Sequence, residues 1–159
     1  MKKKIWYSIE MDHSLLTSAL HNTNYQVTKV FEGLSEERGD FDVRICPEAR
    51  TARETLAHLC DCCQGFMEIS HGKEYKWGSF QGAGLSVAQL LQSQHELRKK
   101  AESFALSHAH DPKAAEFALS MLCLHDAYHV GQMCLLHINL DRVNNMMNKI
   151  ICGYLSKRF

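Results

Sequence analysis

Apolar residues recur at three- and four-residue steps along most of the chain, which is the spacing that places them on one face of an α-helix. The first such stretch begins after Asp12, whose side chain can cap a helix, and ends near Ser35. Its apolar positions are Leu16, Leu20, Val27, Val30, Phe31 and Leu34. Because no stretch alternates apolar and polar residues as a half-buried strand does, the pattern predicts an all-α protein.

Two later helices have clear start signals. Thr51 with Glu54, and Ser86 with Gln89, match the capping box, in which the two side chains cover free backbone donors. The helix after Thr51 is expected to run to about Ser70, and its apolar stripe is Ala52, Leu56, Leu59, Cys63 and Phe66. The helix after Ser86 has its apolar face at Val87, Leu90, Leu97, Ala101 and Phe104.

A fourth helix starts after the capping residue Asp111, with Pro112 at its first position, and continues to about Asn139. One face of this helix carries small residues, which let another helix approach closely: Ser120, Cys123, Ala127, Gly131 and Cys134. A fifth helical segment is expected from Asp141 to about Leu155.

Two longer connections separate these helices. Residues 39–50 are expected to form a loop with an extended piece at Phe41–Val43, closed by Cys46 and Pro47. Residues 71–85 hold four glycines and three aromatic residues, in a loop that is long for a helical bundle. The aromatic rings either pin this loop to the helices or make it a lid over a site, and the sequence leaves both open.

Helices joined by loops, without strands, predict an antiparallel up-and-down four-helix bundle with an additional C-terminal helix. At 159 residues the chain is expected to form a single domain, residues 1–159. Sites in such bundles are built from inward side chains on facing helices.

The charges balance, with 18 Lys and Arg against 18 Asp and Glu, and they are scattered, so nucleic acid is not an expected partner. No apolar run approaches the roughly 18–20 residues of a membrane span, and the lysines at the start are not followed by the apolar region of a signal peptide. Seven cysteines, several at helical apolar positions, fit a reducing compartment. We therefore predict a cytoplasmic protein without a membrane partner.

The strongest chemical signal is a pair of histidines, His125 and His129, spaced by about one helical turn. The stripe that carries them consists of Ala118, Leu122, His125, His129, Gln132 and Leu136. Because apolar residues dominate this stripe, both imidazoles are expected to point inward, where their ring nitrogens need partners. One bound cation satisfies both rings, so the pair predicts a metal site.

Two segments together resemble the DinB/YfiT-like superfamily of four-helix-bundle metalloproteins. They are Thr55–Leu59, which contains His58, and His125–Gln132, which has the pattern His-x-x-x-His-x-Gly-Gln. The resemblance implies one divalent metal held by three histidines, here His58, His125 and His129, and a homodimer. Members of the superfamily include thiol-dependent transferases and isomerases that use low-molecular-weight thiols such as bacillithiol or mycothiol.

Other side chains are expected to support the site. Gln132 could hydrogen-bond a bound water or substrate, Asp61 could orient an imidazole, and Tyr128 could donate a proton. Asp126 is expected to be structural. Cys62 lies one turn beyond His58 on the same face, which leaves open a fourth protein ligand.

Three neutral imidazoles leave a dication with its full charge and an open coordination position, as in catalytic metal sites. Water bound there becomes more acidic, and a bound thiol is held as the nucleophilic thiolate. The leading hypothesis is therefore a metal-dependent thiol transferase or hydrolase that acts on a small electrophilic substrate. Zinc, nickel and iron are the candidate metals, and a low-molecular-weight thiol is the candidate cosubstrate.

Two other interpretations remain open at this point. In the first, the protein is a non-catalytic stress- or damage-response helical dimer with a structural metal. In the second, no metal binds, and the histidines pair with Gln132, Asp61 and backbone carbonyls. The fourth coordination position discriminates between a catalytic and a structural metal site. A water that faces a cavity favours a catalytic site, and a Cys62 ligand favours a structural site.

Overall fold

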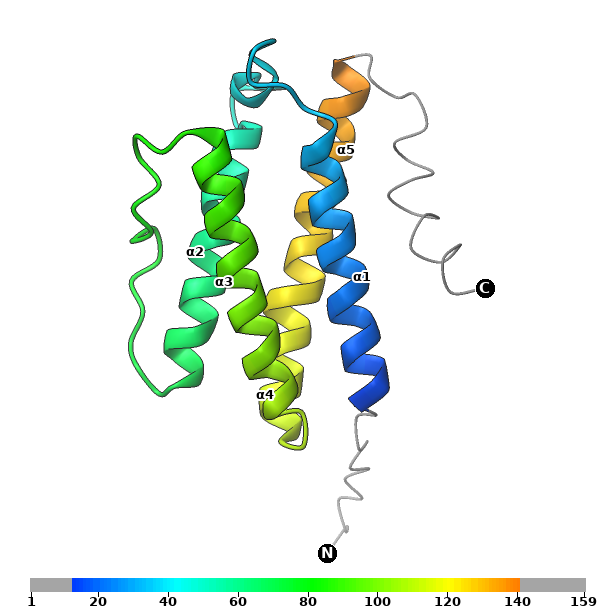
Figure 1. Ribbon diagram of the computed structural model, residues 1–159, viewed down its shortest axis with the longest axis vertical. Helices are drawn as coiled ribbons and strands as arrows, with labels where there is room; N and C mark the ends of the chain where they lie inside the picture. The colour runs from blue at the N-terminus through cyan, green and yellow to red at the C-terminus, as the bar shows by residue number, and fades with distance from the viewer. Residues whose placement is uncertain (1–12, 141–159) are drawn as a thin grey trace, which may run out of the picture.

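The computed structural model describes residues 13–140, and this part of the chain is helical without any strand. Its α-helices are α1 (His13–Glu32), α2 (Ala52–Ser70), α3 (Val87–Ser107), α4 (Pro112–Ala118) and α5 (His125–Asn139) (Figure 1). The prediction of an all-α protein is confirmed for these residues. The predicted cap at Asp12 and the predicted helix from Asp141 to Leu155 lie outside the described residues.

The helix starts lie where the sequence signals predict them. Thr51 and Ser86 both form complete capping boxes, with Glu54 and Gln89 as the reciprocal partners. Asp111 caps α4 through its side chain. These side chains satisfy backbone donors that have no partner inside the helix.

α4 and α5 form one continuous helix. They are joined by a π-helical turn at Leu119–Leu124, in which backbone hydrogen bonds reach one residue further than in an α-helix. The sequence pattern predicts an uninterrupted helix from Pro112 to Asn139 and gives no sign of this turn. Because the π-helical turn ends directly before His125, it sets the angular position of the histidines relative to α4.

α2 and α3 run in the same direction, which corrects the prediction that neighbouring helices alternate up and down (Figure 1). The Cys60 thiol of α2 lies 3.8 Å from the Leu90 carbonyl oxygen near the start of α3. Further along both helices, the rings of Phe66 and Phe104 are centred 6.2 Å apart. The two helices are therefore parallel neighbours.

The long loop of residues 71–85 explains this direction. It runs from the end of α2 back to its beginning, where the Arg53 guanidinium donates to the Leu85 carbonyl. A fully extended loop of this length spans roughly 50 Å, whereas the 19 residues of α2 rise only about 28 Å. The connection is long enough to return along the whole helix, so α3 starts at the same end as α2.

The connection between α1 and α2 contains a 3-10 turn at Asp40–Asp42 in place of the predicted extended piece. Gly39 precedes the turn in the left-handed region, with φ 71°. The turn buries Phe41, whose ring stacks on Phe31 with centroids 6.4 Å apart. Apolar and polar residues that alternate over only three positions do not distinguish a strand from a turn with a buried central side chain.

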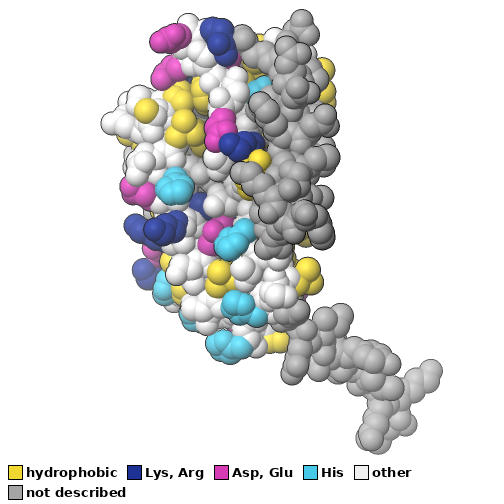
Figure 2. Space-filling view, turned by 45° about the vertical axis from the view of Figure 1, so that its right-hand side comes forward, with side chains coloured by type: hydrophobic (Ala, Val, Ile, Leu, Met, Phe, Trp, Pro, Cys, Tyr) yellow, Lys and Arg dark blue, Asp and Glu magenta, His cyan; other side chains and the backbone are white. Residues whose placement is uncertain are grey.

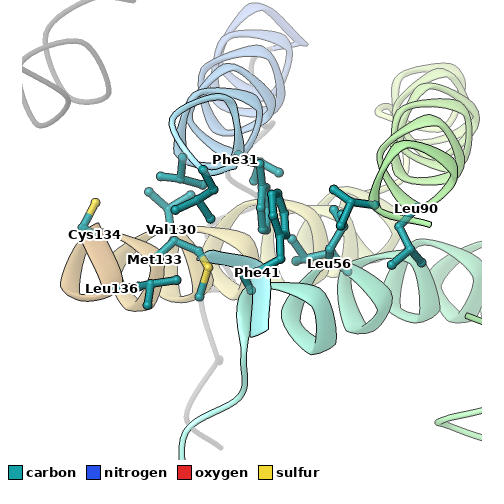
Figure 3. Close-up of a cluster of buried hydrophobic side chains, with 14 residues drawn as sticks. Phe31, Phe41, Leu56, Leu90, Val130, Met133, Cys134 and Leu136 are labelled. Carbon is teal, nitrogen blue, oxygen red and sulfur yellow. The ribbon is translucent and has the colours of Figure 1, made fainter. Parts of the chain in front are cut away.

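Two clusters of buried apolar side chains fill the interior. The first, drawn in Figure 3, includes Phe31 of α1, Leu56 of α2 and Met133 of α5. The second includes Phe66 of α2 and Leu122 of the π-helical turn. All predicted apolar positions of α1 and α2 are buried. Along the continuous α4–α5 helix, His125 and His129 fall between the residues of the second cluster and those of the first, whereas His58 lies on α2 between Leu56 and Leu59 of the first cluster.

The small-residue face of the fourth helix is only partly covered, contrary to the prediction that another helix packs along it. Cys123 and Cys134 are buried, but Ser120, Ala127 and Gly131 are exposed. A Cβ atom added to Gly131 would meet nothing within 4 Å. In the described structure, this side of α5 therefore faces outward.

Charged side chains of both signs are interspersed on the face of the molecule drawn in Figure 2. This distribution agrees with the balanced charge of the sequence. No helix within residues 13–140 is long and apolar enough to cross a membrane.

Candidate functional site

The three histidines named by the resemblance, His58, His125 and His129, lie together between α2 and α5. One ring nitrogen of each lies within 4.8 Å of those of the other two. The Nε2 of His125 is central, at 3.1 Å from the Nε2 of His58 and 3.1 Å from the Nε2 of His129. Three Nε2 atoms therefore converge on one point.

Gln132 forms a hydrogen bond with Nδ1 of His129, the ring nitrogen that does not face the other histidines. The Oε1 of Gln132 accepts a hydrogen bond from the Nδ1 of His129 over 2.7 Å, and its Nε2 donates to the Tyr128 hydroxyl over 2.8 Å. Because an amide oxygen only accepts, His129 carries its ring proton on Nδ1 and keeps a lone pair on Nε2. Gln132 thus orients an imidazole, a role the sequence analysis gave to Asp61. Tyr128 is 63% exposed, beside the histidines.

Asp126 holds the other ring nitrogen of His125. Its Oδ1 lies 3.3 Å from the Nδ1 of His125, and its Oδ2 forms a buried ion pair with Arg98 of α3. A carboxylate paired with a guanidinium is an acceptor only, so the His125 ring proton lies on Nδ1. Asp126 is structural, as predicted, and it also orients a histidine.

Arg98 is the residue near the site that the sequence reasoning missed. Its guanidinium also donates to the Glu102 carboxylate over 2.8 Å and to the Leu20 carbonyl over 3.4 Å, so it ties α1, α3 and α5 together behind His125. The signal was the position of Arg98 three residues before the apolar Ala101, on the buried face of α3, whereas Lys99 falls on the exposed face.

With both rings neutral and protonated on Nδ1, the Nε2 atoms of His125 and His129 repel each other unless a cation lies between them. Two lone pairs then face each other over 3.1 Å, and neither ring supplies the proton that a hydrogen bond needs. Two nitrogens bound to one zinc at about 2.0–2.1 Å lie roughly 3.3 Å apart at the tetrahedral angle. The donor set fits one divalent metal.

His58 and His129 have the protonation state that metal binding requires. Burial lowers the pKa of His58 to about 4, with the nearby Arg50 charge adding to the shift. Burial also lowers the pKa of His129 to about 4, and His125 contributes. Both rings are therefore neutral at physiological pH, and a neutral imidazole is the form that donates a lone pair to a metal.

Asp61 fixes the loop of residues 71–85 to α2, which differs from its predicted role beside an imidazole. Its carboxylate accepts hydrogen bonds from the Tyr75 hydroxyl at 2.8 Å, the Gly78 N–H at 2.8 Å and the Phe80 N–H at 3.0 Å. The aromatic residues of the loop help, because Trp77 packs so closely on Gly65 that a Cβ there would lie 2.6 Å from its ring. The loop is pinned to the helices.

The pinned loop also forms one wall of a pocket beside the histidines. The pocket has a volume of about 490 Å³ and is lined by Arg50, Ala57, His58, Asp61, Trp77, Gly78 and Phe80. A larger hollow of about 680 Å³ near Met67 and Phe104 is lined by none of the three histidines. Among the described residues, the pocket at His58 can therefore bring a small molecule to a histidine of the site.

Cys62 adds a sulfur beside the three nitrogens. Its Sγ lies 3.6 Å from the Nε2 of His58 and 3.7 Å from the Nε2 of His125. The side chain is buried, and burial together with the charge of Asp126 raises the pKa of the thiol to about 12. In the absence of a cation, this thiol is protonated at physiological pH.

Comparisons of the chain with protein-family models, with curated proteins and with solved structures give no match. The geometry and chemistry of the site are therefore the basis for its function.

Proposed function

We propose that the protein binds one divalent transition metal through the Nε2 atoms of His58, His125 and His129. The observation that carries the proposal is the 3.1 Å approach of the Nε2 atoms of His125 and His129, whose Nδ1 atoms already have partners. A dication between them replaces this repulsion with two bonds. Gln132 and Asp126 supply the outer hydrogen bonds that aim metal-binding imidazoles. Zinc, nickel and iron all accept such ligands.

The activity proposed for this site is that of a metal-dependent thiol transferase or hydrolase. When bound, the metal supplies the acidity that activates a thiol or a water. The chain's own residues bind the substrate and donate a proton. The pocket beside His58 holds a small electrophilic substrate between Arg50 and Trp77, and Tyr128 lies beside His129 to donate a proton. A low-molecular-weight thiol is the proposed cosubstrate of the transferase.

The proposed fold is that of the DinB/YfiT-like superfamily, a four-helix bundle with an additional C-terminal helix. This proposal is supported by the side-by-side α1, α2, α3 and continuous α4–α5 helix, with one histidine from α2 and two from α5 (Figure 1). A cytoplasmic location is proposed as well, since the cysteines of the described residues are free thiols, as is typical of a reducing compartment.

The test of this function begins with elemental analysis of protein purified without an affinity tag or chelator. We expect about one equivalent of metal, together with turnover when thiols and electrophiles, or hydrolysable esters, are supplied. His125→Ala should lack both, whereas His95→Ala, which changes an exposed histidine of α3, should keep both. If the wild type takes up no zinc, nickel or iron, the metal site is wrong. If a loaded protein turns over none of these substrates, the enzymatic role is wrong.

The alternative function is a non-catalytic stress- or damage-response protein with a structural metal. The position of Cys62 favours it, because a sulfur 3.6 Å from the Nε2 of His58 can fill the coordination position that catalysis needs. Loaded protein that is inert toward substrates but unfolds at a lower temperature once the metal is removed would support this alternative.

A homodimer formed through α5 is also part of the proposal. Leu124, Leu135 and Ile138 are 71%, 56% and 52% exposed, and they follow one side of the helix with the small Ala127 and Gly131 between them. A second copy of the same helix can approach such a stripe closely and bury it.

Light scattering should therefore give twice the mass of one chain. We expect Leu135→Glu to be monomeric, because the pairing of two chains would bury two uncompensated charges. Leu91→Glu, a matched change at an exposed leucine of α3, should leave the dimer intact. A wild-type monomer at micromolar concentration would rule out a stable dimer.

A further inference from the structure

Cys62 differs from the other cysteines of α2 in what its sulfur faces. The Sγ of Cys60 is directed at the Leu90 carbonyl, and Cys63 packs in the apolar cluster around Phe66. The Sγ of Cys62 instead lies 3.6 Å from the Nε2 of His58 and 3.7 Å from the Nε2 of His125. These are two of the three nitrogens that converge on the proposed metal.

These distances match those of a shared coordination sphere. A zinc-bound sulfur at about 2.3 Å and a zinc-bound nitrogen at about 2.0–2.1 Å lie roughly 3.6 Å apart at the tetrahedral angle. The helix explains the geometry, since Cys62 follows His58 by four residues, and side chains at that spacing share one face of a helix. Without moving its backbone, α2 therefore presents both a nitrogen and a sulfur to the two histidines of α5.

We propose that Cys62 is the fourth protein ligand of the metal, so that the site holds one ion through three nitrogens and one sulfur. The inference rests on the proposed metal site and adds a ligand to it. As the sulfur–metal bond forms, the S–H bond breaks and its proton leaves to solvent. A thiolate ligand also selects among the candidate metals, because sulfur favours zinc over harder ions.

A fourth ligand changes what the site requires of a substrate. Four protein ligands complete the tetrahedral sphere that zinc adopts in structural sites. A reactant from the pocket beside His58 must then either replace one ligand or raise the coordination number to five. The thiolate also halves the formal charge of the site, from +2 with three neutral imidazoles to +1.

Cobalt substitution tests this ligand without any assay of activity. The full-length apoprotein is loaded with Co²⁺ in its wild-type, Cys62→Ala and Cys63→Ala forms, and circular dichroism verifies that each remains helical. We expect the wild type and Cys63→Ala to show both the visible bands of bound cobalt and the near-ultraviolet band of sulfur-to-cobalt charge transfer. Cys62→Ala should keep the visible bands and lose the charge-transfer band. Its zinc affinity should fall by about tenfold or more, since even outer partners of a ligand contribute that much.

The outcomes separate the two proposals. Visible bands with no charge-transfer band in the wild type, or with an equal charge-transfer band in Cys62→Ala, would overturn the sulfur ligand and leave the three-histidine site standing. If no cobalt binds to the wild type, both the proposed metal site and the proposed sulfur ligand are wrong. If Cys62→Ala does not fold, the wild-type spectrum still decides through the ratio of charge-transfer intensity to bound cobalt, compared with Cys63→Ala.

Discussion

Replacing Arg98 by Met is expected to destabilise the protein by about 3–5 kcal/mol, because the change leaves the buried Asp126 carboxylate without its partner. The guanidinium of Arg98 is fully buried, and it also bonds Glu102 and the Leu20 carbonyl. For a chain of this length, such a loss lowers Tm by roughly 6–20 °C. Urea unfolding followed by circular dichroism measures the free energy of unfolding directly.

The matched control for this variant is Lys99→Met, at the next position of α3, where the side chain is exposed. We expect it to change the free energy of unfolding by no more than about 0.5 kcal/mol. The double variant Arg98→Met with Asp126→Leu removes both fully buried charges and should regain much of the lost stability, because only the partly exposed Glu102 carboxylate is then left without its partner. If Arg98→Met and Lys99→Met are equally stable, the ion pair contributes little to the fold.

The Arg98–Asp126 pair also links the core to the site. Asp126 uses one carboxylate oxygen for Arg98 and offers the other to His125. The orientation of a proposed metal ligand therefore depends on a residue of α3 that does not reach the site. A carboxylate held on one side by an arginine is a more rigid acceptor for an imidazole than one that is free to rotate.

The helix starts could be predicted from sequence because each depends on a few adjacent residues. Thr51 with Glu54 and Ser86 with Gln89 cap their helices through contacts that span only one turn. The buried stripes of α1 and α2 could be predicted for a similar reason, since three- and four-residue spacing fixes which residues share a face.

The direction of the helices could not be predicted in this way. Whether α3 is parallel or antiparallel to α2 depends on the path of the loop of residues 71–85. The contacts that fix this loop join distant parts of the chain. Asp61 of α2 binds Gly78 and Phe80, and Arg53 binds Leu85. The π-helical turn at Leu119–Leu124 was also not predictable, because its residues fit the helical pattern equally well without it.

In the candidate site, too, features that depend on nearby residues could be predicted, and features that depend on distant contacts could not. The spacing of His125 and His129 predicts that they share a face, and the structure brings His58 to them from α2. Which carboxylate orients a histidine was not predictable, because Asp61 and Asp126 both lie close to a histidine in sequence. The partners that decide between them come from elsewhere: Arg98 from α3 for Asp126, and the loop of residues 71–85 for Asp61.

In wild-type protein, a chelator is expected to lower Tm, and in His129→Ala it is expected to change nothing. A ligand that binds only the folded state stabilises it by about 2.7 kcal/mol at a concentration 100 times its Kd, which corresponds to roughly 5–11 °C for a chain of this length. His129→Ala removes one of the two Nε2 atoms that face each other over 3.1 Å, and we expect the two remaining nitrogens, even with the proposed Cys62 sulfur, to be too few ligands to retain the metal. Differential scanning calorimetry with zinc and with chelator measures both values.

Two further variants make this comparison specific to the geometry of the site. Gln132→Ala leaves the three histidines in place but removes the acceptor of the His129 Nδ1–H, so it should weaken zinc binding by about 10–100-fold without abolishing it. His95→Ala, at an exposed position of α3, should respond to the chelator as the wild type does. The expected order of metal-dependent stabilisation is therefore wild type equal to His95→Ala, then Gln132→Ala, then His129→Ala with none.

A wild-type Tm that does not respond to zinc or chelator would mean that the converging nitrogens hold no metal. A response that survives in His129→Ala would place the metal elsewhere in the chain.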